Sequence, residues 1–329
     1  MRFYLCRLGF LAALSALVAS ASAQRSIRYR VIEMGALGGA MSTPSGINNS
    51  GVVVGNVQYA DRHIQAFIWD AANGIRRVDP FAAQSSARAI NSTGQIAGSS
   101  QNGFLTEAVV WDSDLSPFVV AEASNGAVAT AINDRGQAVG FREDGVFEIT
   151  NEAFLWPSRD PNSLWTDLFT SNDDSFATGI NDRGFVVGYV DRQAFVVAPN
   201  GALRILAGNP NFGLPAFSVA INDKGSVLVS QLGTGYLFTQ AKRVTVSGGG
   251  PLFPLGLSPN DVVVGYMTTG GRSGFVWDSK NGMTVLDDVL ATPGWHIFSA
   301  NAINRSGQIA AFGIRNGRRR AVLLDPVRA

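Results

Sequence analysis

The sequence predicts an all-β fold, a seven-bladed β-propeller of four-stranded antiparallel blades, from a repeat, its strand pattern and the phase of the chain ends. The repeat is an apolar residue, usually Asn, two variable positions and usually Gly before an apolar run. Successive copies lie 36 to 48 residues apart, and propeller blades are about 40–50 residues long. The copies begin at Ile47, Ile90, Ile132, Ile180, Ile221, Leu257 and Ile303.

The first 23 residues are typical of a secretory signal peptide. Basic residues precede an apolar stretch, 8–19, and small residues at Ala21 and Ala23 fit cleavage after Ala23. The stretch is short for a membrane span, which needs about 20 residues. An uncleaved anchor stays an alternative. We expect residues 24–329 to form a single propeller domain in a secreted or periplasmic protein.

The predicted mature chain has almost no net charge and no cysteine. Removal of Arg2 and Arg7 leaves 24 basic residues against 25 acidic residues, a net charge of −1, and Cys6 is removed with them. A nucleic-acid or anionic-membrane partner would require a basic excess. We therefore expect neither partner, and we expect a monomer that is held together by its core rather than by disulfides.

The fourth copy shows how each repeat makes four strands. Segments 175–181, 185–190, 194–197 and 203–206 are rich in small, β-branched or apolar residues and are separated by turn signals. In the turn 181–184, the Asn side chain favours turn opening and Gly accepts the positive φ that closes a hairpin.

Two further features recur inside the repeats. Another Gly recurs in five copies, at Gly55, Gly98, Gly140, Gly188 and Gly265, and we interpret it as packing between blades. The predicted third strands place Phe and Trp two residues apart, so both rings share one face of the sheet and are expected in the core. Examples are Phe67 with Trp69, Phe154 with Trp156, and Phe275 with Trp277.

The phase of the chain ends predicts how the ring closes. Residues 27–34 match the fourth strand of a unit, whereas residues 320–325 match a third strand. Pairing these two segments would complete the last blade and remove two open sheet edges. We therefore expect the N-terminal strand to pair with the last blade.

The phrases Ala-x-x-Ile-Asn-x-x-Gly-x-Val-Val-Gly and Ala-Phe-x-Trp resemble the HAF repeat of bacterial extracellular proteins, across essentially the whole mature chain. The segment 34–39 resembles the leucine-glycine link between units of that family. The His of the His-Ala-Phe triplet is absent, because Gln65, Glu107, Glu152, Gln193 and Arg320 stand before the Ala. The resemblance implies an extracellular repeat protein and no particular activity.

The sequence shows no catalytic, metal-binding or cofactor-binding pattern. His63 and His296 are far apart, no acidic cluster has the spacing of a calcium loop, and no nucleophile elbow or phosphate loop stands in a supporting context. Asp134, Asp182 and Asp223 each follow a turn Asn, so turn chemistry is their main interpretation and ion binding the alternative. We expect no cofactor and no metal.

The candidate ligand-binding residues lie where function usually lies on a rigid scaffold, on its loops. In a propeller, the links from second to third strand and from fourth strand to the next unit share one face. The charged and aromatic candidates on these links are Asp61, Arg62, His63, Arg142, Glu143, Asp144, Asp173, Asp174, Asp191, Arg192, Arg272, Trp295, His296 and Arg315.

Two main functions remain open from the sequence. The first is a binding or scaffold propeller whose partner is a carbohydrate, a peptide or a cell-surface molecule. The alternative is a propeller enzyme, a lyase or hydrolase with its site at the central channel. A purely structural envelope component is a third hypothesis. The absence of a catalytic cluster favours the first, so we do not expect an enzyme.

Overall fold

The structure is a computed structural model in which nearly every regular element is a β-strand. The described residues are 27–144, 150–157, 163–169, 174–208 and 215–327. Among them, the helical element is one short 3-10 turn, η2 (Leu286–Val289). None of the helical segments in these ranges has the length and apolar character to span a membrane. The predicted signal peptide, residues 1–23, lies outside the described residues.

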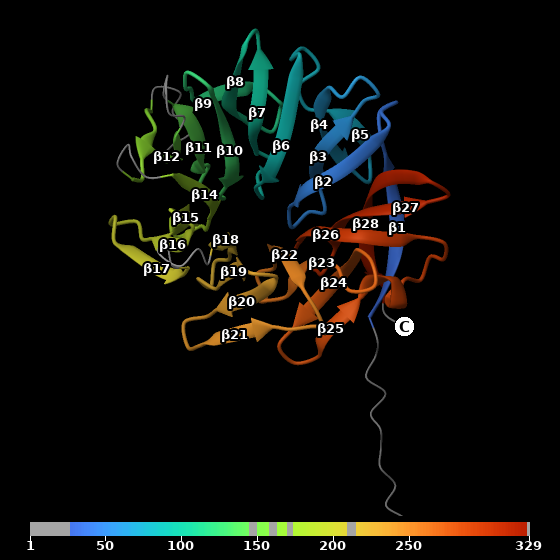
Figure 1. The fold of residues 1–329 in the computed structure, drawn as a ribbon. Coiled ribbons are helices and arrows are strands. Elements are labelled where there is room, and N and C mark those ends of the chain that lie inside the picture. Colours follow the sequence, from blue (N-terminus) through green and yellow to red (C-terminus); the bar gives the residue numbers. More distant parts are fainter. Residues whose placement is uncertain (1–26, 145–149, 158–162, 170–173, 209–214, 328–329) are drawn as a thin grey trace, which may run out of the picture.

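Antiparallel four-stranded sheets follow one another along the chain and are arranged radially around a central axis (Figure 1). The first holds β6 (Gln84–Ile90), β7 (Ile96–Asn102), β8 (Leu105–Trp111) and β9 (Pro117–Ala121). The second holds β10 (Gly126–Ile132), β11 (Ala138–Asp144), β12 (Thr150–Trp156) and β13 (Thr166–Asp167). The third holds β14 (Ser175–Ile180), β15 (Val186–Val190), β16 (Gln193–Val197) and β17 (Leu203–Ala207).

Two more sheets of the same kind continue around the axis. One holds β18 (Ala216–Ile221), β19 (Val227–Gln231), β20 (Thr234–Phe238) and β21 (Arg243–Val246). The other holds β22 (Leu252–Leu257), β23 (Val263–Met267), β24 (Ser273–Asp278) and β25 (Gly282–Val285).

The two ends of the chain meet in one eight-stranded sheet. Its strands are β1 (Arg28–Gly35), β2 (Met41–Ile47), β3 (Val53–Gln58), β4 (Ile64–Asp70), β5 (Gly74–Arg77), β26 (His296–Ile303), β27 (Ile309–Arg315) and β28 (Arg318–Val327). β1 pairs antiparallel with β28, from Arg28 opposite Val327 to Gly35 opposite Ala321. β28 touches β2 through one parallel pair, Met41 with Arg319. The segments placed side by side by the phase of the repeat are therefore paired in the structure.

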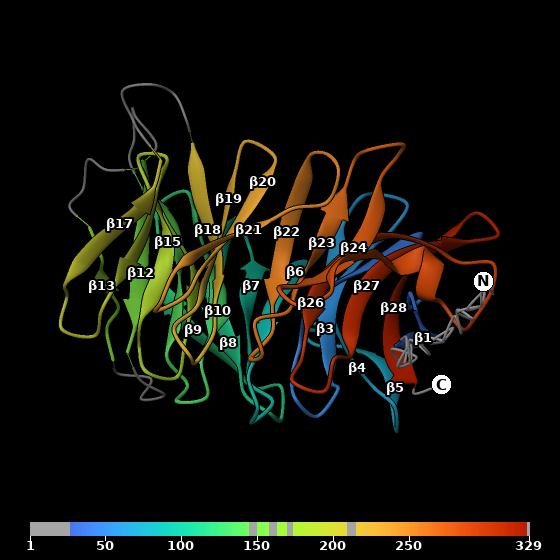
Figure 2. The same ribbon diagram turned by 90° about the horizontal axis from the view of Figure 1, so that it is seen from below.

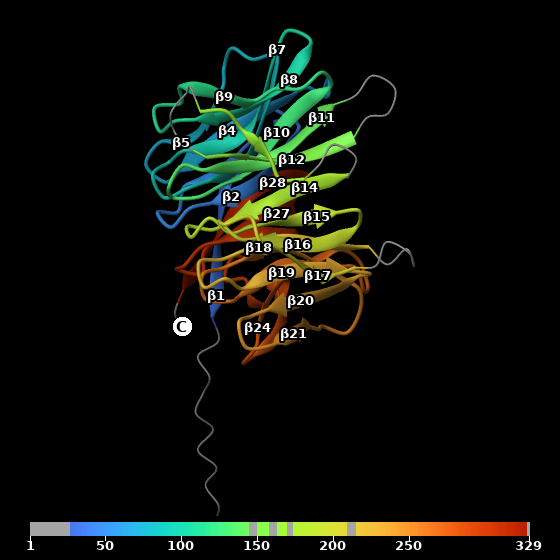
Figure 3. The ribbon, with the colours of Figure 1, turned by 90° about the vertical axis from the view of Figure 1, so that its left-hand side faces the viewer.

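The antiparallel order separates the loops into two faces, which Figures 2 and 3 show from the side. Links from first to second strand and from third to fourth strand lie at one end of each sheet, which we call the Asn-turn face. Links from second to third strand and from fourth strand to the next sheet lie at the other end, which we call the candidate face. The predicted ligand-binding residues were assigned to the candidate face.

The third-strand aromatic residues form the core, as predicted. Phe67, Phe154, Phe275 and Trp111 are fully buried, and Trp156 is 2% exposed. Phe154 and Trp156 pack in one cluster with Ala97 and Val110 of the preceding sheet. Neighbouring sheets are thus joined by apolar burial, which is the dominant favourable term in folding.

The strand glycines are required by a close approach inside one sheet, so their interpretation as packing between blades was wrong. The register of β14 shifts between Ala177 and Gly179, beside Gly188 of β15. A Cβ on Gly188 would overlap the carbonyl oxygen of Phe176 and lie 2.8 Å from the ring of Phe195, both in the same sheet. A larger residue there would force the bulge or the core ring to move.

Candidate functional site

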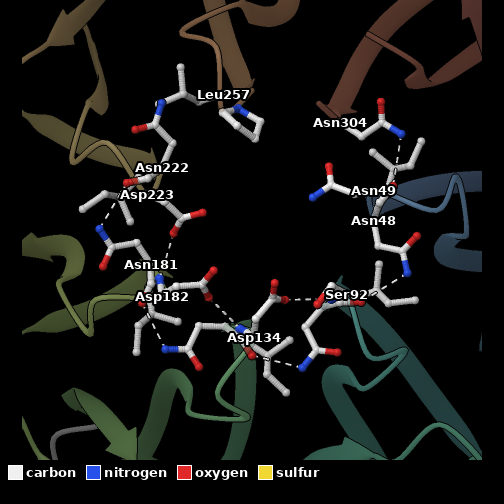
Figure 4. A pocket seen from close by; sticks show the side chains of 18 of the residues that line it. Asn48, Asn49, Ser92, Asp134, Asn181, Asp182, Asn222, Asp223, Leu257 and Asn304 are labelled. Carbon is white, nitrogen blue, oxygen red and sulfur yellow. Dashed lines mark hydrogen bonds between the residues drawn. The ribbon is translucent and has the colours of Figure 1, made fainter. Parts of the chain in front are cut away.

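The seven copies of the Asn phrase converge around the central axis and line a pocket of about 180 Å³ (Figure 4). The apolar residue at the start of each phrase forms its wall, and the Asn turns form its rim. The polar lining residues are Asn48, Asn49, Asn91, Ser92, Asn133, Asp134, Asn181, Asp182, Asn222, Asp223 and Asn304.

Each turn is closed by hydrogen bonds of the kind that the sequence predicts. In the fourth copy, the Oδ1 of Asn181 accepts the backbone N–H of Arg183 at 3.1 Å and of Phe185 at 3.0 Å. The N–H of Gly184 donates to the carbonyl oxygen of Asn181 at 2.9 Å. Gly184 has φ +82°, a conformation that costs little only for glycine.

The same Asn side chains also join neighbouring copies, a role that the sequence analysis missed. The Nδ2 of Asn133 donates to the carbonyl oxygen of Asn181 at 3.0 Å. Equivalent bonds, 3.0–3.2 Å long, run from Asn48 to Asn91, Asn91 to Asn133, Asn181 to Asn222, Asn222 to Ser258 and Asn304 to Asn48. One amide therefore closes its own turn and holds the next one.

The acidic residues after the turn Asn make a second belt of bonds. The N–H of Asp134 donates to the Oδ1 of Asp182 at 2.7 Å, and the N–H of Asp182 donates to the Oδ1 of Asp223 at 2.9 Å. Asp134 in turn accepts the N–H of Ser92 at 2.8 Å. These contacts agree with turn chemistry as the main role of the three carboxylates.

Burial and neighbouring carboxylates disfavour the ionised form of Asp182 at the rim of the pocket. Partial burial raises the pKa of Asp182, and the charges of Asp223 and Asp134 raise it further, against the backbone bond from Asp134 and the charge of Arg135. Across the described parts of the chain, no group of three or more His, Cys, Asp or Glu residues is placed to hold a metal ion.

On the candidate face, Asp61, Arg62 and His63 lie in the turn between β3 and β4. The Nδ1 of His63 lies 2.5 Å from the Oδ1 of Asp61, and its ring stacks on Tyr59 with a centroid separation of 4.2 Å. The hydrogen bonds from His63 lower the pKa of Asp61. Arg62 has φ 73°, so the turn is tightly wound around this pair.

Arg142, Glu143 and Asp144 belong to β11 rather than to a loop, which corrects their predicted location. The Arg142 side chain is only 15% exposed, and it forms ion pairs with Glu152 and with Asp167, the latter at 3.1 Å. Its guanidinium therefore neutralises carboxylates on the neighbouring strands.

Trp295 is a core residue and not an exposed ligand contact. It is 8% exposed and packs in a cluster with Ile297 and Leu286. Arg315, the last residue of β27, lies over its ring at 5.9 Å. His296 begins β26, and its Nδ1 lies 2.5 Å from the Oδ2 of Asp287.

The remaining candidates lie on the candidate face in separate places. Asp174 precedes β14, and its carbonyl oxygen accepts the N–H of Asp191 at 3.0 Å. Asp191 and Arg192 form the turn from β15 to β16, with φ 46° and 66°. The Arg272 guanidinium lies 3.8 Å from the ring centroid of Tyr266. Asp173 and the side chain of Asp144 lie outside what the structure describes.

A row of aromatic rings beside Asp174 was missed. Phe141, Phe176, Tyr189 and Phe217 form successive ring contacts with centroids 4.7–4.8 Å apart, across three neighbouring sheets. Phe217 is 37% exposed and the other three are half-buried. A sequence signal existed, because Phe176, Phe217 and Phe253 each stand four residues before the first residue of the Asn phrase.

A family model matches part of this chain. The model of a family described as "Protein of unknown function (DUF3466)" matches residues 79–202. No curated protein matches the sequence.

Among solved structures, a streptogramin B lyase is similar with TM-score 0.60 and 11% identity, over 91% of this chain and 98% of that one. Virginiamycin B lyase from Staphylococcus aureus gives TM-score 0.59 and 7% identity, over 91% and 99%. The β-propeller domain of the Trilobed protease from Pyrococcus furiosus gives 0.55 and 10%, over 88% and 96%. At these identities the likeness establishes an all-β fold of propeller type and says nothing of activity.

Proposed function

We propose that this protein is an exported binding or scaffold propeller of the HAF-repeat type, whose ligand is a carbohydrate, a peptide or a cell-surface molecule. The ligand contacts the candidate face. The observation that supports this best is the row formed by Phe141, Phe176, Tyr189 and Phe217. Rings that are partly exposed and held in mutual contact offer a rigid surface for stacking at low entropic cost.

The proposal includes a closed ring of seven blades. Its support is the extended pairing of β1 with β28 and the bond from the Asn304 Nδ2 to the carbonyl oxygen of Asn48. A second bond, from the Asn301 Nδ2 to the carbonyl oxygen of Pro44 at 2.8 Å, joins the same two copies. In this proposal the eight-stranded sheet consists of two blades. One blade is formed by β2–β5, and the other is formed by β26–β28 together with β1.

Several polar side chains that could perform chemistry at the pocket and on the candidate face have structural partners. Asp182 and Asp223 accept turn amides, Arg142 is ion-paired, and His296 contacts Asp287. A general base must instead be within reach of a substrate proton. This arrangement favours binding over catalysis, and the propeller enzyme is kept as an outcome of the test.

The test is a glycan and peptide array probed with purified protein that begins at residue 24, with and without calcium. We expect binding, and we expect Phe217→Ala to weaken it about tenfold because an exposed stacking ring is lost. Ile205→Ala is the matched control, since Ile205 is 41% exposed on the outer strand β17, away from the row.

Two results would overturn the proposal. One is equal weakening by Phe217→Ala and Ile205→Ala. The other is no binding on any array together with turnover of polysaccharide substrates, which would establish the enzyme instead.

A further inference from the structure

A second concave site lies on the Asn-turn face, away from the aromatic row. It is a cleft of about 370 Å³ between the sheet of β14–β17 and the sheet of β18–β21. Sites for small organic ligands usually measure about 300–1,000 Å³. Its apolar lining comes from Phe185, Val196, Ile221, Val227 and Phe238.

A departure from the repeat accounts for the room in this cleft. Phe238 ends β20, where the corresponding third-strand residue is Trp in four other copies. Those residues, Trp69, Trp111, Trp156 and Trp277, are at most 6% exposed and fill the space against the preceding sheet. Phe238 is half-buried and packs against the cluster of Val187 and Ala194 from that preceding sheet. A smaller ring at this position leaves the outer part of the interface unfilled.

The charged groups that line the cleft are both cations. Arg183 lies over the ring of Phe185 at 5.3 Å and approaches Gly225 of the next turn. Arg204 of β17 stands opposite Val196 in the register, so both side chains share the sheet face that borders the cleft. In the described ranges, neither guanidinium has an ion-pair or hydrogen-bond partner, and the lining contains no carboxylate.

We propose that this cleft binds a small organic anion with an apolar body, of the aryl-alkyl carboxylate class. The body would occupy the surface of Phe185, Val196 and Phe238. The carboxylate would lie between Arg183 and Arg204, whose planar guanidinium groups suit carboxylate oxygens. This site is separate from the candidate face, so it holds whether or not the proposed function does.

The test uses three probes of matched shape, 4-phenylbutyrate, 4-phenyl-1-butanol and 4-phenylbutylamine, with calorimetry or ligand-observed NMR. We expect the acid to bind at least tenfold more tightly than the alcohol and the amine. Arg183→Gln and Arg204→Gln are each expected to weaken binding of the acid about tenfold, as for a lost charge-assisted hydrogen bond. Arg135→Gln is the matched control, because Arg135 holds the place of Arg183 in the preceding copy and lies outside the cleft lining.

A filling variant provides an independent check. Phe238→Trp introduces the residue that four other copies have at this position and should abolish binding of the acid without lowering the unfolding temperature. Equal affinity for acid and alcohol, no binding of the acid at 10 mM, or equal weakening by Arg135→Gln would each overturn the proposal. Binding of peptides with a free C-terminal carboxylate, but not of 4-phenylbutyrate, would also overturn the small-molecule assignment.

Discussion

A single asparagine in this molecule supports two levels of structure. The Oδ1 of Asn133 accepts two N–H groups of its own turn, while its Nδ2 donates to the carbonyl oxygen of Asn181 in the next copy. Only an amide offers an acceptor and two donors on one short side chain. This explains physically why the phrase prefers Asn to Asp or Ser at its second position.

The raised pKa of Asp182 predicts an unusual pH dependence. A carboxyl whose pKa is higher in the folded than in the unfolded state disfavours folding when it is ionised, and this penalty disappears as pH falls through its folded pKa. Asp182→Asn keeps the Oδ1 that accepts the N–H of Asp134. We therefore expect this variant to unfold at a higher temperature than the wild type at pH 7, with a gain that shrinks towards pH 4.

Asp70 provides a control of opposite sign. Hydrogen bonds from Asn73 and Arg76 lower the pKa of Asp70, so its ionised form stabilises the fold above its unfolded pKa and this contribution is lost in acid. Asp70→Asn should lower the unfolding temperature at pH 7 and have little effect at low pH. If thermal scans show Asp182→Asn to be neutral or destabilising at pH 7, burial and charge crowding are not the main effects at the pocket rim.

At the level of elements, the pairing of β1 with β28 can be tested by a crosslink. Arg30 stands opposite Asp325, and their side chains form a surface ion pair at 2.7 Å. Residues 24–329 contain no cysteine, so in a protein that begins at residue 24 Arg30→Cys with Asp325→Cys adds the only two thiols. We expect oxidation to link them and to add about 2–4 kcal/mol to the free energy of unfolding, measured by denaturation with and without reductant.

The control for this crosslink moves one cysteine out of register. Glu33 stands opposite Val322, three residues from Asp325 along β28. Three residues span about 10 Å along a strand, which is too far for a disulfide. Efficient linkage in Glu33→Cys with Asp325→Cys, or none in the matched pair, would contradict the register.

The strands and turns could be predicted because their causes are local, whereas the site residues depend on packing between sheets. Asn181 and Gly184 specify their turn within four residues, and the phase of the repeat indicates that β1 belongs beside β28. Arg142 could not be placed correctly, because its ion pairs come from strands that follow it by ten and 25 residues. Trp295 follows Gly294 and therefore resembles a loop residue, although it is buried by β26 and η2.

The aromatic row shows the same limit on the scale of the whole molecule. Phe141, Phe176 and Phe217 come from three different sheets, and their contact depends on the angle between those sheets. The spacing of Phe176 and Phe217 to the Asn phrase is visible in the sequence, but their mutual contact is not. Regular copies build the scaffold, and the side chains that differ between copies, such as Phe238, give each sector its own surface.

The belt of Asn amides around the axis is weakest at the sixth copy, where Ser258 replaces the Asn. The Oγ of Ser258 accepts the N–H of Asn260 at 3.1 Å and of Val262 at 3.0 Å, so it reproduces the bonds within the turn. A hydroxyl is too short to reach the following copy as the amide Nδ2 does elsewhere. Among the described residues, the junction between the sixth and seventh copies therefore lacks the Nδ2 bond from the second position of the phrase, and the bond there is a longer one from the Asn260 Nδ2 to the carbonyl oxygen of Arg305, at 3.5 Å.

Ser258→Asn should supply that missing bond to the carbonyl oxygen of Asn304 and raise the free energy of unfolding by about 0.5–1.5 kcal/mol. The reciprocal change, Asn133→Ser, converts the third copy to the arrangement of the sixth and should lower it by about 0.5–1.5 kcal/mol, because the carbonyl oxygen of Asn181 loses the Nδ2 donor and keeps only the N–H of Gly184. Chemical denaturation measures both. No change in stability from either substitution would mean that Asn acts only inside its own turn, whose bonds Ser reproduces, and that contact between neighbouring copies depends on the apolar core alone.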